Sequence, residues 1–162
     1  HTLTQTTQYP LEQLRLNIFG LPFWVPTLFG SAAVLAGMGS QLTRIVFPRK
    51  KKINGFVVTT AILVFLGLYF VSGVMPKISM STIMLGLVAL LIYLLLSDRS
   101  AGALIFTIGT MIAGTAFESM LVHFGVFSYM PPMNHFYGVA PWLPFLYTGV
   151  AVAVDDYMSW SS

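Results

Sequence analysis

The sequence predicts an all-α protein, a polytopic bundle of about five transmembrane helices. Of its 162 residues, 56% are hydrophobic and only 8% are charged, and the mean hydropathy is +0.81. A soluble domain of this size cannot bury that much apolar surface, so lipid must cover most of it. The apolar runs are also continuous rather than alternating in polarity, which is atypical of the strands of a membrane barrel.

Five apolar segments make up the predicted bundle. Charges, prolines and polar clusters mark their boundaries at 21–43, 54–75, 79–96, 101–124 and about 139–154. The first four are close to the roughly 20 residues that a helix needs to cross the hydrocarbon core. The fifth is shorter and contains Pro144. It therefore either spans with little tilt or begins earlier, in the loop that carries Asn134 and Tyr137.

The chain divides into three parts around this bundle. Residues 1–20 form a polar N-terminal segment, in which 9–19 alternate as in a short interfacial helix, and they begin at His1 rather than Met. This start indicates a processed or truncated N-terminus. Residues 21–154 form the bundle, and 155–162 form a short polar tail.

Basic residues predict the orientation in the membrane. Most of them lie between the first two segments or in the turn 97–100: Arg44, Arg49, Lys50, Lys51, Lys52 and Arg99. The positive-inside rule therefore places these connections and the Asp155–Asp156 tail inside, and the N-terminus outside. The alternative interpretation is that the basic loop binds anionic lipid headgroups.

Glu118 is the charged residue in the middle of an apolar run. A carboxylate at membrane depth costs several kcal/mol unless it is protonated, paired or hydrated, and such residues usually mark a site. On a helix, Glu118 shares a face with Thr115. One interpretation is a polar contact to a ligand headgroup or a proton-carrying group. The other is a neutral carboxyl group hydrogen-bonded to another helix, since desolvation favours the protonated form.

Two histidines have alternative interpretations. His123 lies one turn after Ser119, and His135 lies in the following loop. Each can be an interfacial hydrogen-bonding residue or a ligand of a pigment magnesium. Their spacing of twelve residues, with no carboxylate or cysteine close by, gives no zinc signature. We therefore predict no metal site.

Catalysis is not indicated. The chain has no cysteine, and no nucleophile motif, zinc-protease motif or glycine-rich phosphate loop is found in it. Glu118 and His123 are five residues apart, on different faces of a helix, which argues against an acid–base pair. We therefore expect no catalytic residues and a function in binding or assembly.

Asp98 has two interpretations. It precedes the segment 101–124, where a carboxylate can cap a helix N-terminus, and Ala in its place would then cost about 1 kcal/mol. Alternatively, it contacts a partner protein. A loss of association larger than the loss of stability would indicate the second.

Four segments resemble the Insig (insulin-induced gene) family of membrane proteins. The stretch FWVPTLFGSAAVLAG at 23–37, followed by a basic loop, is similar to the family's second span. SDRSAG at 97–102 is similar to its Asp-Arg-Ser turn, and MLVHFGVFSY at 120–129 to the end of a later span. PWLPF at 141–145 is similar to the opening of its last span. The segments occur in the family's order and cover about residues 18–154. The family has six spans, so the chain resembles an Insig-like homologue without the first.

The resemblance implies a non-enzymatic protein that holds a sterol or diacylglycerol-type lipid in an intramembrane cavity. It also implies docking on other integral membrane proteins through Asp98, which matches the family's turn aspartate, and Arg99. The lipid-binding residues would be Glu118, Ser119, Thr115 and His123. The carboxyl of Glu118 stands where the family has a neutral polar residue, which puts sterol specificity in doubt. Membrane lipids and membrane proteins are the expected partners, and nucleic acid is not.

A different class of function is an accessory subunit of a large photosynthetic or respiratory complex. Such a subunit would use the bundle for packing, with His123 or His135 available to a chlorophyll-type pigment. Beyond a bound lipid, or a pigment in this alternative, we expect no cofactor. The family analogy points to the endoplasmic reticulum, and a bacterial inner membrane or an organelle membrane is equally compatible with the sequence.

Overall fold

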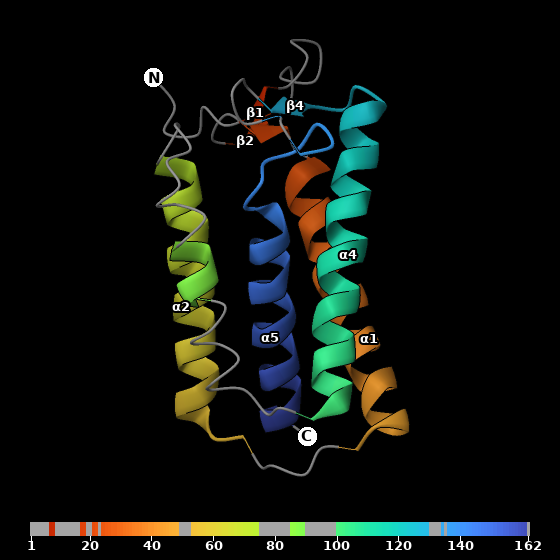
Figure 1. The fold of residues 1–162 in the computed structure, drawn as a ribbon, viewed down its shortest axis with the longest axis vertical. Helices are drawn as coiled ribbons and strands as arrows, with labels where there is room; N and C mark the ends of the chain where they lie inside the picture. Colours follow the sequence, from red (N-terminus) through yellow and green to blue (C-terminus); the bar gives the residue numbers. More distant parts are fainter. Residues whose placement is uncertain are drawn as a thin grey trace.

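The computed structural model is a bundle of helices that run up and down alongside one another (Figure 1). It describes residues 7–8, 17–18, 21–22, 24–48, 53–74, 85–89, 100–129, 134 and 136–161. The long helices among them are α1 (Trp24–Val46), α2 (Gly55–Val74), α4 (Ala101–His123) and α5 (Leu143–Ser161). Residues 85–89, inside the predicted segment 79–96, are also helical. The predicted all-α bundle is confirmed.

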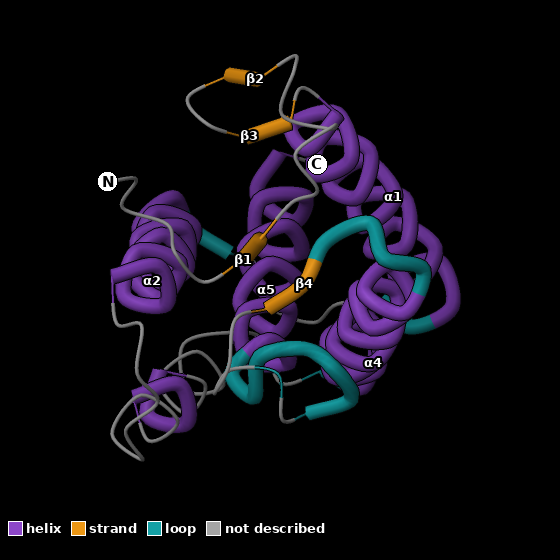
Figure 2. Tube along the Cα trace, turned by 90° about the horizontal axis from the view of Figure 1, so that it is seen from above, coloured by secondary structure: helices purple, strands orange, loops and turns teal. Residues whose placement is uncertain are grey.

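Helix α5 lies in the middle and contacts α1, α2 and α4 (Figures 1 and 2). Small residues on α5 make this possible, because they let neighbouring helices approach closely. A Cβ atom added at Gly149, for example, would lie 3.4 Å from the ring of Phe65 on α2. The neighbouring Ala151 is completely buried. The core of the bundle is therefore built around the last helix of the chain.

The outer surface of the bundle is apolar, as a lipid-facing surface must be. On α1, large side chains that are more than half exposed include Val34, Leu35, Met38, Leu42 and Ile45. Among the described residues, one helix, α4, has both the length and the hydropathy of a membrane span, and Gly55–Phe70 forms a shorter apolar helix. These features agree with the predicted transmembrane architecture.

The last helix differs from its predicted range of 139–154. It begins at Leu143, with Pro144 in the first turn, where a missing N–H costs nothing, and it continues to Ser161. The predicted polar tail from 155 is therefore wrong for the described residues, because Asp155 and Asp156 are 3% and 1% exposed within α5. The physical reason is that α1 supplies polar partners for Asp155, as shown below.

Short strands lie at one end of the bundle, which we call the outer end. Strand β1 (Thr7–Gln8) pairs antiparallel with β4 (Ser128–Tyr129), and β2 (Asn17–Ile18) pairs with β3 (Leu21–Pro22). The predicted interfacial helix over 9–19 is therefore wrong at residues 17–18, which are extended. The predicted segment from 21 becomes helical only at Trp24.

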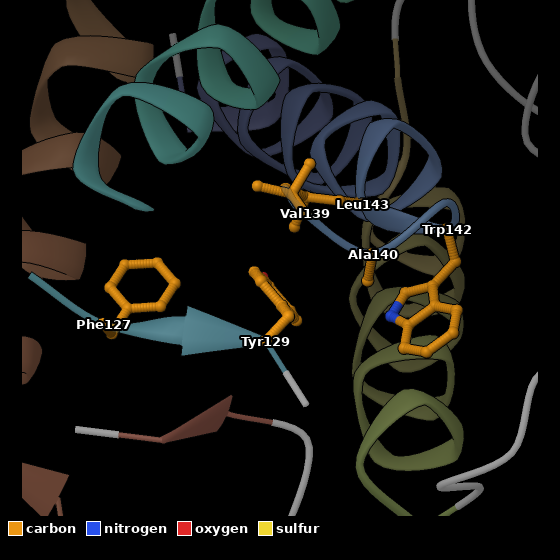
Figure 3. Packing of buried hydrophobic residues seen from close by; sticks show 6 residues of the cluster. All are labelled: Phe127, Tyr129, Val139, Ala140, Trp142 and Leu143. Atoms are coloured by element: carbon orange, nitrogen blue, oxygen red, sulfur yellow. The ribbon is translucent and has the colours of Figure 1, made fainter. Parts of the chain in front are cut away.

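A cluster of buried residues fills the outer end between β4 and the start of α5 (Figure 3). It consists of Phe127, Tyr129, Val139, Ala140, Trp142 and Leu143. A tight hairpin leads into it, in which Phe136 and Val139 exchange backbone hydrogen bonds of 3.2 and 3.0 Å. The two residues between them have positive φ, 51° at Tyr137 and 82° at Gly138. This is the geometry of a primed two-residue turn. The packing of Phe127 and Tyr129 in this cluster is one of the contacts that hold β4.

Candidate functional site

Glu118 forms the centre of a buried polar site on α4. The residue is only 8% exposed, and each of its carboxyl oxygens accepts a hydrogen bond. The Tyr129 hydroxyl on β4 donates to Oε2 over 2.6 Å, and the Tyr147 hydroxyl on α5 donates to Oε1 over 2.9 Å. The carboxyl group is therefore hydrogen-bonded to two other elements, β4 and α5, and its contact with a ligand stays a prediction. A polar group of this kind is costly to bury without such partners.

The end of α4 explains how Tyr129 reaches Glu118. After Phe124 the chain reverses, with Gly125 N donating to Val122 O and Val126 N donating to Leu121 O, both over 3.0 Å. These two bonds form a Schellman motif, and Gly125, at φ 71°, has the left-handed conformation that the motif requires. The reversal brings β4 back over α4, so that a residue eleven positions after Glu118 meets its side chain.

Gly114 explains how Tyr147 reaches the same carboxyl. A Cβ atom added at Gly114 would lie 2.2 Å from Cδ1 of Tyr147, so the tyrosine ring occupies the space that a side chain would need. Glu118 lies one turn further along the same face of α4. The ring therefore rests on Gly114 while its hydroxyl group reaches Glu118.

The site retains capacity for another hydrogen bond. A carboxylate has about four acceptor positions, and the two tyrosines account for two of them. A further donor, such as the hydroxyl group of a ligand, can therefore bond to Glu118 either beside the tyrosines or in place of one of them.

The other residues predicted for lipid binding are arranged differently. The Thr115 hydroxyl donates to the backbone oxygen of Met111 on its own helix over 2.8 Å. Ser119 is half-buried beside Glu118, while His123 is exposed, with its ring 5.7 Å from that of Phe124. The network thus joins Glu118 to two tyrosines that the sequence analysis did not select. Asp98, Arg99 and His135 lie outside the described residues.

The described part of the chain holds no cluster of metal-binding side chains. Nowhere in it do three or more His, Asp or Glu side chains gather closely enough to hold a metal ion.

The N-terminus of α4 is capped by Ser100. Its Oγ accepts a hydrogen bond from the Ala103 amide over 3.3 Å. Ser100 therefore occupies the N-cap position, while Asp98 lies outside the described residues, so its capping interpretation stays a prediction. Docking by Asp98 stays a prediction too.

We expect Ser100→Ala to lower the free energy of unfolding by about 1 kcal/mol. The backbone amide of Ala103, in the first turn of α4, then loses its hydrogen-bond acceptor. Asp98→Ala is expected to change stability less. Thermal unfolding of both variants in the same detergent checks this, and an equal or larger loss for Asp98→Ala would contradict it.

A second polar cluster joins α1 and α5 near the opposite end of the bundle. The Ser40 hydroxyl donates to Asp155 Oδ1 over 2.5 Å. Arg44 Nη2 lies 3.2 Å from the same carboxylate oxygen and also donates to the Asp155 backbone oxygen. The charge of Asp156 attracts Arg44 as well. The sequence analysis missed this cluster, although the spacing of Ser40 and Arg44, one helical turn apart, placed them on one face of α1.

The comparisons with known proteins agree with the family resemblance. No family model matches the chain. An INSIG protein homolog from Mycolicibacterium vanbaalenii is 29% identical over 159 residues, which is 94% of this chain and 72% of the relative.

Solved structures have the same fold. The crystal structure of the Insig homolog MvINS from Mycobacterium vanbaalenii has a TM-score of 0.82 at 24% identity, over 98% of this chain and 82% of that one. A cross-linked trimer of a cysteine variant of MvINS gives the same values. The similarity in sequence and fold extends over almost the whole chain, which is therefore similar to Insig homologues and has the helical fold of MvINS.

Proposed function

We propose that this Insig-like protein is a non-enzymatic membrane protein that binds a lipid at the Glu118 site and docks on other integral membrane proteins. The observation that supports lipid binding is a buried carboxyl group on α4, held between the hydroxyl groups of Tyr129 and Tyr147. Intramembrane ionisable groups of this kind are expensive and usually functional. The family resemblance supplies the ligand class, a sterol or diacylglycerol-type lipid.

The chemistry of the site favours a neutral headgroup. A hydroxyl group can donate a hydrogen bond to a carboxyl oxygen of Glu118. A phosphate headgroup would place a second negative charge beside the carboxyl, and like charges in a desolvated site are costly. The proposed ligand is therefore an uncharged lipid alcohol.

Docking is proposed for the turn that contains Asp98 and Arg99, on the basis of the family resemblance. The cross-linked trimer of MvINS shows that a protein of this fold can be captured as an oligomer. Copies of the chain itself are therefore among the partners to be tested.

Lipid binding can be tested by native mass spectrometry with lipid extraction on the gently solubilised protein. We expect one neutral lipid per chain, and we expect Glu118→Leu to weaken its binding about 10- to 100-fold, the loss of one hydrogen bond to a charged group. Ser31→Ala is the matched control, because among the described residues the Ser31 hydroxyl bonds only to Thr27 O, and Ser31 lies on the exposed face of α1.

Two results would contradict the proposal. One is a protein that carries no lipid, and the other is an unchanged lipid content in Glu118→Leu. Pigments or many co-purifying subunits would instead support the accessory-subunit alternative.

A further inference from the structure

Strand β1 lies across the outer end of the bundle. In the view from above, β1 and β4 lie side by side over α5 (Figure 2). The pairing is antiparallel, with Thr7 opposite Tyr129 and Gln8 opposite Ser128. A segment near the start of the chain is thus held against the loop that follows α4.

The residue opposite Thr7 is the one that contacts the polar site. Tyr129 pairs with β1 through its backbone, and its hydroxyl group donates to Glu118 over 2.6 Å. Its ring is buried and lies edge-on to Phe127, at 5.8 Å between centroids. A continuous set of contacts therefore runs from β1 through β4 to Glu118.

The strand pair is too short to persist on its own. Each strand has only two residues, and even a longer isolated hairpin is marginally stable in water. The persistence of β1 on the bundle thus depends on what fixes β4. The buried hydrogen bond between Tyr129 and Glu118 is such a restraint, because it attaches β4 to α4. Any group that takes the place of Tyr129 on the Glu118 carboxyl breaks this attachment.

We propose that the Tyr129–Glu118 hydrogen bond is a latch that holds β1 across the outer end of the bundle. A lipid hydroxyl that bonds to Glu118 Oε2 in place of Tyr129 releases β4 and, with it, β1. The release by lipid rests on the proposed function, whereas the latch itself is a property of the protein alone.

Hydrogen–deuterium exchange of the peptide that contains Thr7 and Gln8 tests the latch without any ligand. We expect Tyr129→Phe to speed exchange in this peptide about tenfold, because a broken hydrogen bond of about 1.4 kcal/mol shifts the opening equilibrium by that factor. The phenylalanine ring keeps the packing against Phe127.

Tyr147→Phe is the matched control. It removes the hydrogen bond to the other oxygen of the same carboxyl but leaves β4 attached, so exchange at residues 7–8 should stay within about twofold of the wild type. Equal acceleration in both variants, or none in Tyr129→Phe, would overturn the latch. Thermal unfolding of both variants shows whether they are folded to the same extent.

Dioctanoylglycerol is the probe for release by lipid. Once mass spectrometry shows it bound, it should speed exchange at residues 7–8 in the wild type and have little further effect in Tyr129→Phe. Bound probe with unchanged exchange would overturn release by lipid. Failure of the probe and of native lipids to bind would count against the proposed function and leave the comparison of the two tyrosine variants as the test of the latch.

Discussion

Asp155→Ala is expected to lower the free energy of unfolding by about 3 kcal/mol, because the largely buried Arg44 loses the carboxylate with which it forms an ion pair. The Arg44 side chain is 17% exposed and that of Asp155 only 4%, so water compensates little for the lost ion pair. The substitution also removes the acceptor of the Ser40 hydroxyl, which is completely buried. Reversible unfolding in mixed micelles of a mild detergent and dodecyl sulfate measures the change.

Two variants divide this loss into its parts. Ser40→Ala keeps the ion pair and should cost about 1 kcal/mol, the contribution of one hydrogen bond. Asp155→Asn keeps the size of the side chain and an acceptor but removes the charge, so its loss should lie between the other two. If Asp155→Ala costs no more than Ser40→Ala, the ion pair does not stabilise the junction of α1 and α5.

The helices could be predicted from the sequence because a helix that faces lipid is recognisable from its own run of apolar residues, without knowledge of its neighbours. Each crossing requires about 20 apolar residues, and this requirement located α1, α2 and α4 to within a few residues. The end of α5 could not be located this way. Asp155 and Asp156 interrupt the apolar run, and only the partners on α1 allow the helix to continue through them.

The candidate site could be predicted only in part, for a related reason. Glu118 is conspicuous in the sequence because a carboxyl group at membrane depth must have a function or a partner. Its partners are not conspicuous, because Tyr129 and Tyr147 are eleven and 29 residues away, in segments rich in other aromatic residues. The Gly125 turn was the available signal for Tyr129, since a glycine after a helix indicates a chain reversal.

The glycines of the membrane helices are a further case in which the sequence predicts a contact but not the residue that makes it. Small residues in a membrane helix indicate close packing, but they do not identify the partner. A Cβ atom added at Gly30 or Gly109 would meet nothing within 4 Å, whereas one at Gly102 would lie 2.8 Å from Cβ of Phe47. The tightest approach is at Gly114, where the neighbour is also a member of the polar site.

Gly114→Ala is therefore expected to destabilise both the fold and the site. The new methyl group would lie 2.2 Å from Tyr147 Cδ1, so the ring must move away from α4, and its hydroxyl group then loses the 2.9 Å hydrogen bond to Glu118. Overpacking and the lost hydrogen bond together should cost about 2–4 kcal/mol. Unfolding in the same mixed micelles measures this cost.

Gly109→Ala is the control for Gly114→Ala on the same helix. Its added methyl group meets no neighbour, and alanine favours a helix over glycine, so this variant should be neutral or more stable by up to about 1 kcal/mol. Combining Gly114→Ala with Tyr147→Ala separates the causes. If the loss arises from the tyrosine ring, the Gly114 substitution should cost little in the Tyr147→Ala background. An undiminished loss there would show that Gly114 is required for another reason, and the account of how Tyr147 reaches Glu118 would be wrong.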